Sequence, residues 1–254
     1  MTLQFASLGS GSRGNATLIK SKGALLLVDC GFTIKETERR LEILGHSPDD
    51  ISAILVTHEH SDHIKGVGPF ARKHQLPVYA THGTAQYQDF NKLPSLTAIN
   101  IQQAFKLADI EITPVAVPHD AREPCQFVFR SAKKTVGLLT DLGSITPHVT
   151  EQYRHCDALM LECNHCLQML SMGPYPPSLK ARVGGQWGHL NNQQAANFLA
   201  EINMERLQHL VISHISEKNN TEALARQAIT RVYGERSSLT LAEQNTVLNW
   251  IMVQ

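Results

Sequence analysis

Four side chains of types that bind metal ions lie within six positions of the stretch VTHEHSDHIKG (56–66). They are His58, His60, Asp62 and His63. The residues before them are strongly apolar, as in a buried strand. At an extended strand end, residues i and i+2 face the same side, so the first two imidazoles can converge on one point. Asp62 and His63 follow the turn and would face a second point, so the spacing predicts two adjacent metal sites with nitrogen and oxygen ligands.

Three further polar residues each follow an apolar strand and precede a polar turn. His119 ends TPVAVPH, Asp141 ends TVGLLTD and His214 ends HLVISH. Buried polar groups are costly without partners, and a two-metal site needs ligands from several strand ends. These three residues are therefore candidates to complete the site.

The elements that must position these residues alternate between strands and helices. Apolar or alternating stretches predict strands at 3–8, 16–21, 24–29, 51–57, 77–81, 110–119, 126–131, 134–141, 158–162, 208–214 and 239–250. Helical spacing predicts helices at 33–45, 62–74, 192–202 and 221–234, and a short helix starting within 83–88. Two facing mixed sheets with outer helices, an αββα sandwich of the α/β class, satisfy this order. No low-complexity linker interrupts the chain, so we predict one domain over residues 1–254.

The composition excludes several classes of protein. The chain has 254 residues, of which 42% are hydrophobic and 18% charged, as in an ordinary globular protein. Lys plus Arg equals Asp plus Glu at 23 each, which argues against a protein that coats nucleic acid through overall charge but leaves a local basic groove open. No signal peptide or membrane span is evident, and the five cysteines are irregularly spaced. We therefore expect a cytoplasmic protein with reduced thiols and no membrane association.

The ligand pattern as a whole resembles the metallo-β-lactamase fold superfamily. The HxHxDH motif of that family matches residues 58–63, and its later His, Asp and His match His119, Asp141 and His214. The resemblance implies one metal on His58, His60 and His119, and a second on Asp62, His63 and His214, with Asp141 bridging both. It also implies that Asp29, in LLVDCG, contacts the metal ligands and holds them in place without binding metal itself. The alternative is that Asp29 is only a turn residue at the end of a strand. The donor set suits two divalent ions, Zn, Mn or Fe, and does not choose among them.

Two such ions would make a bridging hydroxide available at neutral pH, which implies a hydrolase. We expect Asp62 to act as a catalytic residue by orienting that hydroxide. The superfamily cleaves β-lactams, thioesters and phosphodiesters, so the fold alone does not name the bond. An iron-based oxidoreductase is disfavoured because no acid replaces a ligand of the first motif and no flavin domain is present. A non-catalytic metal-binding protein is disfavoured because all seven ligand positions are kept.

Several shorter stretches resemble the YycJ-like, exonuclease-type group of this superfamily. They are SLGSGSRGN, TDLG, LECNH, GPYPPSLKARV, GHLNN and SHISEKNN. This resemblance implies a phosphodiesterase, most specifically a nuclease with DNA as substrate. The alternative is a small-molecule hydrolase that acts on a cyclic phosphodiester, a thioester or a lactam at the same site. The chain departs from the group at CNHC (163–166), where SNHD is usual, and at GHLNN, where GHLSN is usual.

Candidate catalytic and phosphate-binding residues lie outside the metal motif. His189 follows a glycine and opens a predicted helix, where an imidazole suits a phosphate oxygen or a leaving group, so we predict a phosphate clamp or a general acid. Ser10, Ser12 and Asn15 lie in a Gly-rich loop that could donate hydrogen bonds to phosphate, with a simple hairpin turn as the alternative.

Positive charge and the CNHC stretch supply the remaining candidates. Lys180 and Arg182, with Arg13, could contact a phosphate backbone, although solvated surface charge explains each equally well. We expect His165 to face the site and bind substrate. One isolated CxxC pair is weak evidence for a metal or redox site, so we expect structural thiols at 163 and 166.

Overall fold

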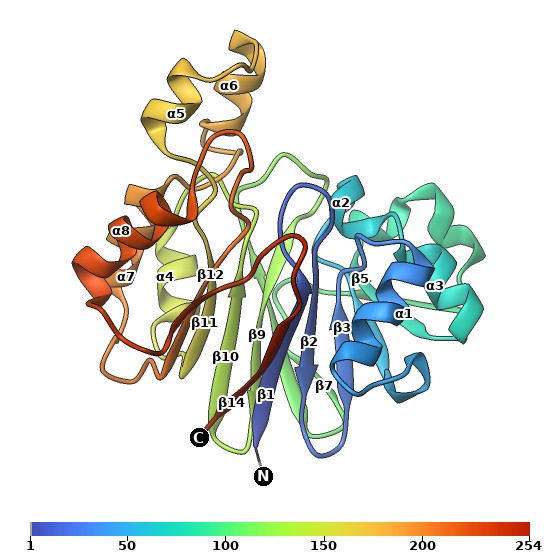
Figure 1. The fold of residues 1–254 in the computed structure, drawn as a ribbon. Helices are drawn as coiled ribbons and strands as arrows, with labels where there is room; N and C mark the ends of the chain where they lie inside the picture. Colours follow the sequence, from blue (N-terminus) through green and yellow to red (C-terminus); the bar gives the residue numbers. More distant parts are fainter. Residues whose placement is uncertain (1) are drawn as a thin grey trace.

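The computed structural model describes residues 2–254 and places two seven-stranded sheets face to face (Figure 1). The first sheet comprises β1 (Leu3–Gly9), β2 (Ala16–Lys20), β3 (Leu25–Val28), β4 (Ala53–Leu55), β5 (Pro77–Thr81), β6 (Ser95–Ile99) and β14 (Leu248–Val253). The second comprises β7 (Phe105–Leu107), β8 (Ile110–Ala116), β9 (Cys125–Ser131), β10 (Lys134–Leu139), β11 (Ala158–Glu162), β12 (His209–Ser213) and β13 (Leu239–Leu241). Their orders are β14-β1-β2-β3-β4-β5-β6 and β13-β12-β11-β10-β9-β8-β7. Each sheet contains parallel and antiparallel pairs.

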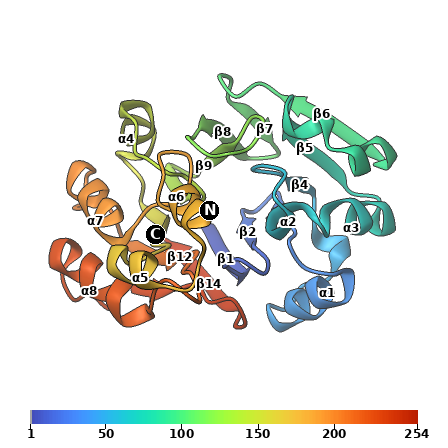
Figure 2. The same cartoon turned by 90° about the horizontal axis from the view of Figure 1, so that it is seen from above.

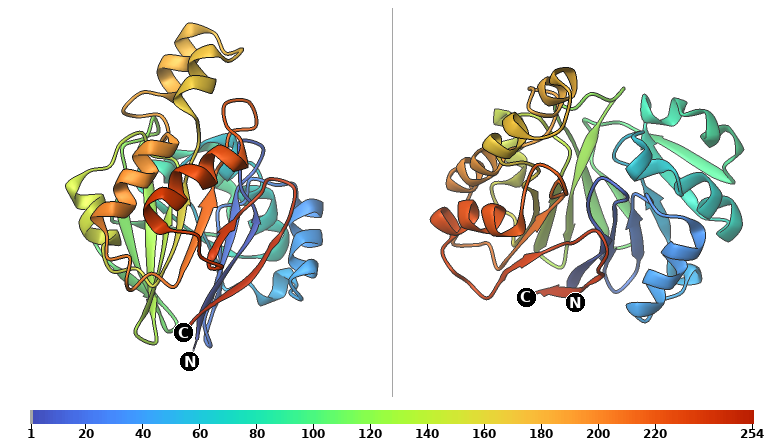
Figure 3. Two further views of the ribbon diagram at one scale, coloured as in Figure 1. Left: turned by 60° about the vertical axis from the view of Figure 1, so that its left-hand side comes forward. Right: turned by 45° about the horizontal axis from the view of Figure 1, so that its top comes forward.

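Helices cover both outer faces, as the view from above shows (Figure 2). On the first sheet lie α1 (Ile34–Ile43), α2 (Ser61–Ile64) and α3 (Val67–His74), and on the second lie α4 (Pro147–Tyr153), α7 (Asn192–Glu201) and α8 (Glu222–Tyr233). Short 3-10 turns occupy Pro48–Asp50, Thr84–Gln86 and Gln88–Lys92. The helices α5 (Leu167–Met172) and α6 (Pro177–Val183) stand out from the sandwich (Figure 3). The predicted αββα sandwich is confirmed.

Three apolar layers hold this arrangement together. The layer between the sheets contains Phe5, Phe127 and Phe129, all fully buried. The other two layers lie between each sheet and its helices, around Phe70 on one side and Phe198 on the other. Burying one such side chain stabilises the fold by roughly 1.5–3 kcal/mol. The strand ends that carry the polar motifs are therefore fixed by apolar packing on both faces of each sheet.

Two predicted elements are each divided in the structure. The predicted helix 62–74 is interrupted at Gly66, whose N–H donates to the carbonyl of Cys30 at 2.8 Å and whose missing side chain leaves room for the carbonyl of Phe32. The predicted strand 239–250 is two strands, β13 at the edge of the second sheet and β14 beside β1 in the first. Its polar middle, AEQNT (242–246), crosses between the sheets.

No helix within residues 2–254 combines the length and the apolar character that a membrane crossing requires.

Candidate metal centre

The seven predicted ligands come together at one end of the two sheets. Ligand-type atoms lie within 4.8 Å of one another in four overlapping sets, three of which consist of predicted ligands alone. These three sets are His58, His60 and His119; Asp62, His63 and His214; and His58, His63 and Asp141. The two sets expected from the resemblance are therefore both present, and Asp141 lies in a set with residues of each.

Three of the seven non-glycine residues with positive backbone φ angles within residues 2–254 follow strands that lead into this centre. Asp29 follows β3 at φ 59°, Asp141 follows β10 at φ 53° and His214 follows β12 at φ 51°. This conformation turns the chain abruptly as it leaves the sheet and costs of order 1–3 kcal/mol per residue. Such strain is concentrated where a side chain must be aimed at a functional point, and here all three residues belong to the same centre.

Each of four imidazoles has one ring nitrogen beside a protein oxygen and the other directed into the centre. The Nδ1 atom of His58 lies 3.0 Å from Thr57 Oγ1, and that of His63 lies 2.8 Å from Asp29 Oδ2. The Nδ1 atom of His119 lies 3.0 Å from the Gly188 carbonyl, and that of His214 lies 2.9 Å from Glu162 Oε1. Ligating histidines are usually fixed in this way, because the outer partner sets the tautomer and the ring orientation. Asp29 contacts His63 in this way, and its supporting role stays a prediction.

The inward-facing atoms lack adequate protein partners, as a metal site requires. His60 Nδ1 lies 3.0 Å from His58 Nε2 and 3.1 Å from His119 Nε2, so three nitrogens face one another. Asp141 Oδ2 and His214 Nε2 are buried without a hydrogen-bond partner. Burial lowers the pKa of His58 well below its ordinary value and also lowers the pKa of His119. A lowered pKa favours the neutral ring, which keeps the lone pair that a cation needs. Burial also opposes the charged form of His63 and His214, but the neighbouring carboxylates prevail and raise the pKa of both. The imidazole and carboxylate donors together fit a pair of divalent ions.

Glu162, at the end of β11, is part of this centre although our sequence analysis did not assign it. It is fully buried, and its Oε1 lies 2.7 Å from His189 Nδ1 as well as beside His214. Its Oε2 accepts from the backbone N–H groups of Leu142 and Leu190. Burial opposes ionisation, but the charge and hydrogen bonds of His189 and His214 prevail and hold the pKa of Glu162 at about 2. His119 was identified as a polar residue at the end of an apolar strand, and Glu162 at the end of ALMLE fits the same rule.

We expect Glu162→Gln to lower hydrolytic activity or metal affinity by roughly 10–100-fold, the usual effect of losing a partner behind a metal ligand. The amide keeps the size of the side chain but loses the charge that fixes both imidazoles. Activity and bound metal should be measured together, with the exposed Glu151→Gln as a control. Wild-type values of both quantities in Glu162→Gln would show that the contact is only structural.

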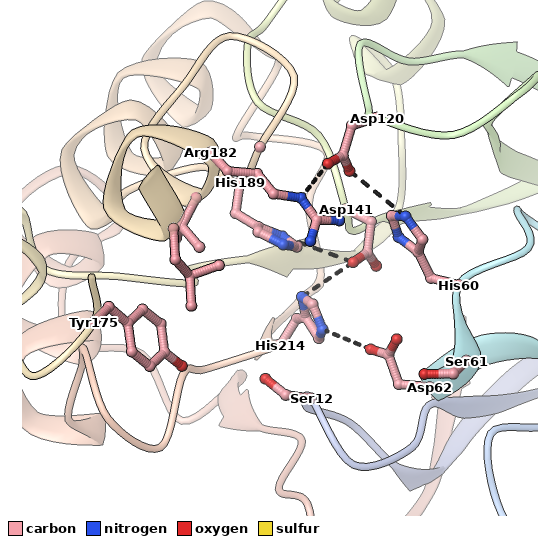
Figure 4. Close-up of a pocket in the computed structure, with 13 residues that line it drawn as sticks. Ser12, His60, Ser61, Asp62, Asp120, Asp141, Tyr175, Arg182, His189 and His214 are labelled. Carbon is pink, nitrogen blue, oxygen red and sulfur yellow. Dashed lines mark hydrogen bonds and ion pairs between the residues drawn. The ribbon is translucent and has the colours of Figure 1, made fainter. Parts of the chain in front are cut away.

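Asp120 is the second residue that our sequence analysis did not assign. Its Oδ1 lies 3.6 Å from His60 Nε2 and 3.7 Å from His119 Nε2, and its Oδ2 accepts from Arg182 Nε (Figure 4). Arg182, which belongs to α6, is thereby tied to the ligand cluster. No local pattern in the sequence pairs two residues that lie 62 positions apart.

A cavity of about 370 Å³ opens beside the ligands. Ser12, Asp62, Arg182 and His189 line it, as the predictions for these residues require, and Tyr175 from the α5–α6 segment forms part of the opposite wall (Figure 4). The side chain of Asp62 is 21% exposed and that of His189 also 21%, so both can reach a bound molecule. The cavity thus joins the metal cluster to an arginine and an imidazole.

The structure does not bring the other four predicted substrate residues to this cavity. Ser10 is buried, and its Oγ accepts a hydrogen bond from the backbone N–H of His214 at 2.9 Å. Asn15 is also buried, and its Nδ2 lies 3.2 Å from Asp62 Oδ2 and 3.0 Å from His63 Nε2. Both therefore hold ligands in place. His165 is 1% exposed, with neither ring nitrogen hydrogen-bonded, and half-buried Lys180 donates to the carbonyl of Ser171.

The charge and thiol predictions outside the cavity have similarly local explanations. Arg13 pairs with Glu217 at 2.6 Å on the surface. Cys163 is buried and Cys166 half-buried, both as free thiols, and burial raises the pKa of Cys163. A buried thiol of raised pKa is a poor nucleophile and a poor metal ligand, in agreement with structural thiols.

Comparison with known proteins defines the class. The profile of the Beta-lactamase superfamily domain matches residues 25–215. The chain belongs to this superfamily, and with its buried His/Asp clusters it is a metal-dependent hydrolase.

Particular relatives narrow the comparison. The chain is 36% identical to exodeoxyribonuclease YycJ of Bacillus anthracis over 93% of this chain and 91% of that protein. It is 33% identical to exodeoxyribonuclease WalJ of Streptococcus pneumoniae over 87% and 85% of the two chains. The metallo-β-lactamase fold protein YhfI of Bacillus subtilis superposes with a TM-score of 0.74 at 19% identity, covering 97% of this chain and 99% of that one, and so supports the fold. The resemblance that the motifs indicated is confirmed.

Proposed function

We propose that this chain is a two-metal phosphodiesterase that digests DNA from an end. The observation that carries the proposal is the joining of both ligand sets, through Asp141, to a cavity that also contains His189 and Arg182. The similarity to two exodeoxyribonucleases over most of the chain supports DNA as the substrate. The cavity, about 370 Å³, lies at the small end of ligand pockets and suits one terminal nucleotide better than a length of duplex.

We assign the metals as the resemblance implies. His58, His60 and His119 would hold one ion, Asp62, His63 and His214 the other, and Asp141 would contact both. When bound, two divalent cations supply Lewis acidity and lower the pKa of water, so that a nucleophile is available at neutral pH. The nitrogen and oxygen donors suit Zn, Mn or Fe.

The remaining groups bind and orient the substrate. Arg182, fixed through Asp120, places a guanidinium on the cavity wall, where it can pair with a phosphate oxygen. Asp62 lies on the cavity floor and can accept a hydrogen bond from water there, with Asn15 Nδ2 holding its carboxylate at 3.2 Å. Arg182 and Asp62 thus orient the phosphate and the water, and neither needs to transfer a proton.

His189 is placed to give a proton to the leaving oxygen. Its Nδ1 is occupied by Glu162 at 2.7 Å, which leaves Nε2 for the substrate. A carboxylate behind an imidazole fixes the tautomer and stabilises the protonated ring, which is the arrangement of a general acid. A phosphate clamp is the other role that this geometry supports.

The deciding experiment is hydrolysis of 5′-phosphorylated single-stranded and duplex DNA in the presence of Mn or Zn. RNA of the same sequence and a cyclic dinucleotide serve as parallel substrates. We expect mononucleotides to be released progressively from DNA. Turnover of the cyclic phosphodiester with no activity on either DNA would overturn the nuclease proposal in favour of a small-molecule hydrolase.

A further inference from the structure

Large exposed apolar side chains are concentrated on the segment that projects beside the cavity. Six such residues occur within residues 2–254: Ile43, Leu96, Leu167, Met172, Trp187 and Met252. Three of them fall in the short stretch 167–187, which contains α5 and α6 and stands out from the sandwich (Figure 3). An exposed apolar side chain beside a site is a candidate contact for a bound molecule.

Trp187 is the aromatic member of this group and lies next to the catalytic groups in the chain. Its side chain is 63% exposed, while Gly188 and His189 after it, and Arg182 and Val183 before it, line the cavity. The loop is firmly held: the Gly188 carbonyl contacts His119 Nδ1 at 3.0 Å, and the His189 N–H donates to Val183 at 2.9 Å. An indole is therefore exposed to solvent on a well-held stretch of backbone whose neighbouring residues line the cavity.

Two lysines belong to or contact the segment that contains α5 and α6. Lys218 Nζ lies 5.8 Å from the ring centroid of Tyr175, which lines the cavity. Lys180, on α6, donates to a backbone carbonyl and forms no ion pair with a carboxylate of residues 2–254. Aromatic faces together with uncompensated lysines are the combination that binds single-stranded nucleic acid, because bases stack on the rings and phosphates pair with the cations.

We infer that Trp187 stacks on an unpaired nucleobase of the strand whose phosphodiester lies in the cavity, so that the protein prefers unpaired DNA ends to blunt duplex. This inference rests on the proposed nuclease function. Trp187 lies in the chain between residues that line the cavity, and this position favours a nucleobase of the bound strand as its partner. A second copy of the chain would have no reason to bind beside the catalytic cavity.

Tryptophan fluorescence tests the inference directly, because the chain has only two tryptophans. Trp250, on β14, packs against His46 and Lys20 away from the cavity. Trp250→Phe therefore isolates the emission of Trp187, and Trp187→Phe isolates that of Trp250 as the matched control. Each metal-loaded variant is titrated with a phosphorothioate-linked thymidine octamer, which resists hydrolysis, and with an abasic octamer of the same charge.

We expect the thymidine octamer to quench about half of the Trp187 emission and the abasic octamer to leave it nearly unchanged, as base stacking requires. The emission of Trp250 should change with neither. In steady-state assays, Trp187→Ala should raise KM for single-stranded DNA about 10-fold and change kcat less.

Three results would overturn the inference. They are equal quenching by the abasic octamer, unchanged Trp187 emission while wild-type protein hydrolyses DNA, and a concentration-dependent emission change without DNA that accompanies dimer formation. The absence of both hydrolysis and binding of DNA would instead remove the proposed function on which the inference rests, so the two failures are distinguishable.

Discussion

Asp141→Asn is expected to lose bound metal and DNA hydrolysis together, with kcat/KM at least roughly 1,000-fold lower. Asp141 is buried, its Oδ2 lies 3.2 Å from His63 Nε2 and its Oδ1 lies 3.4 Å from His214 Nδ1. Asp141 also lies in a set of ligand atoms with His58 and His63, one residue from each predicted ligand set, so we expect its carboxylate to be shared between the two ions. Asparagine is the informative substitution because it tolerates the positive φ of 53° at this position, whereas alanine would add backbone strain.

Metal content by mass spectrometry and DNA hydrolysis should be measured on the same preparation. Asp49→Asn, an exposed residue of the first 3-10 turn, is the matched control and should keep both. Full metal content in Asp141→Asn would refute the bridging role, even if activity were lost.

His189→Ala is expected to lower kcat by roughly 10²–10⁴-fold, the usual contribution of a positioned general acid. Bound metal should stay at the wild-type level because this residue is outside the seven assigned ligands. His189 nevertheless lies in a set with Asp141, Glu162 and His214 whose ligand atoms are within 4.8 Å of one another, so the metal count is an essential measurement. Exposed His148→Ala is the matched control.

A substrate with a good leaving group separates the two roles considered for His189. The p-nitrophenyl ester of thymidine 5′-phosphate needs little protonation of its leaving oxygen. His189→Ala should recover most of its lost rate on this ester if the imidazole is a general acid. An equal loss on DNA and on the ester would assign a phosphate clamp instead, and loss of metal would make the residue a ligand.

The fold, and the gathering of the seven predicted ligands at one place, were predictable because the informative signals are local. A strand buried on both faces is an apolar run, and a polar residue at its end is conspicuous, as at His119 and Asp141. The β12 strand and His214 follow the same rule. Glu162 obeyed it too, but a single acid within LECNH gave no ligand spacing to distinguish it from a surface residue.

What could not be predicted depends on contacts between distant parts of the chain. Asp120 is part of the site because Arg182 folds back and donates a hydrogen bond to it. The side chain of Asn15 is hydrogen-bonded to Asp62, and is not free for substrate, because Asp62 lies against the loop of Asn15. The division of 239–250 between two sheets is likewise set by which edge strand each half meets. The arm of α5 and α6 has short helices with few buried residues, so its apolar periodicity was too weak to predict them.

The most direct test of the two-metal account is to count ions per chain while DNA hydrolysis is measured on the same sample. Metal-free protein should be refilled stepwise with Mn or Zn and analysed by mass spectrometry at each step. The account predicts that bound metal reaches two ions per chain and that hydrolysis rises with occupancy of the second. Full hydrolysis with one ion bound, or saturation at one ion per chain, would contradict it.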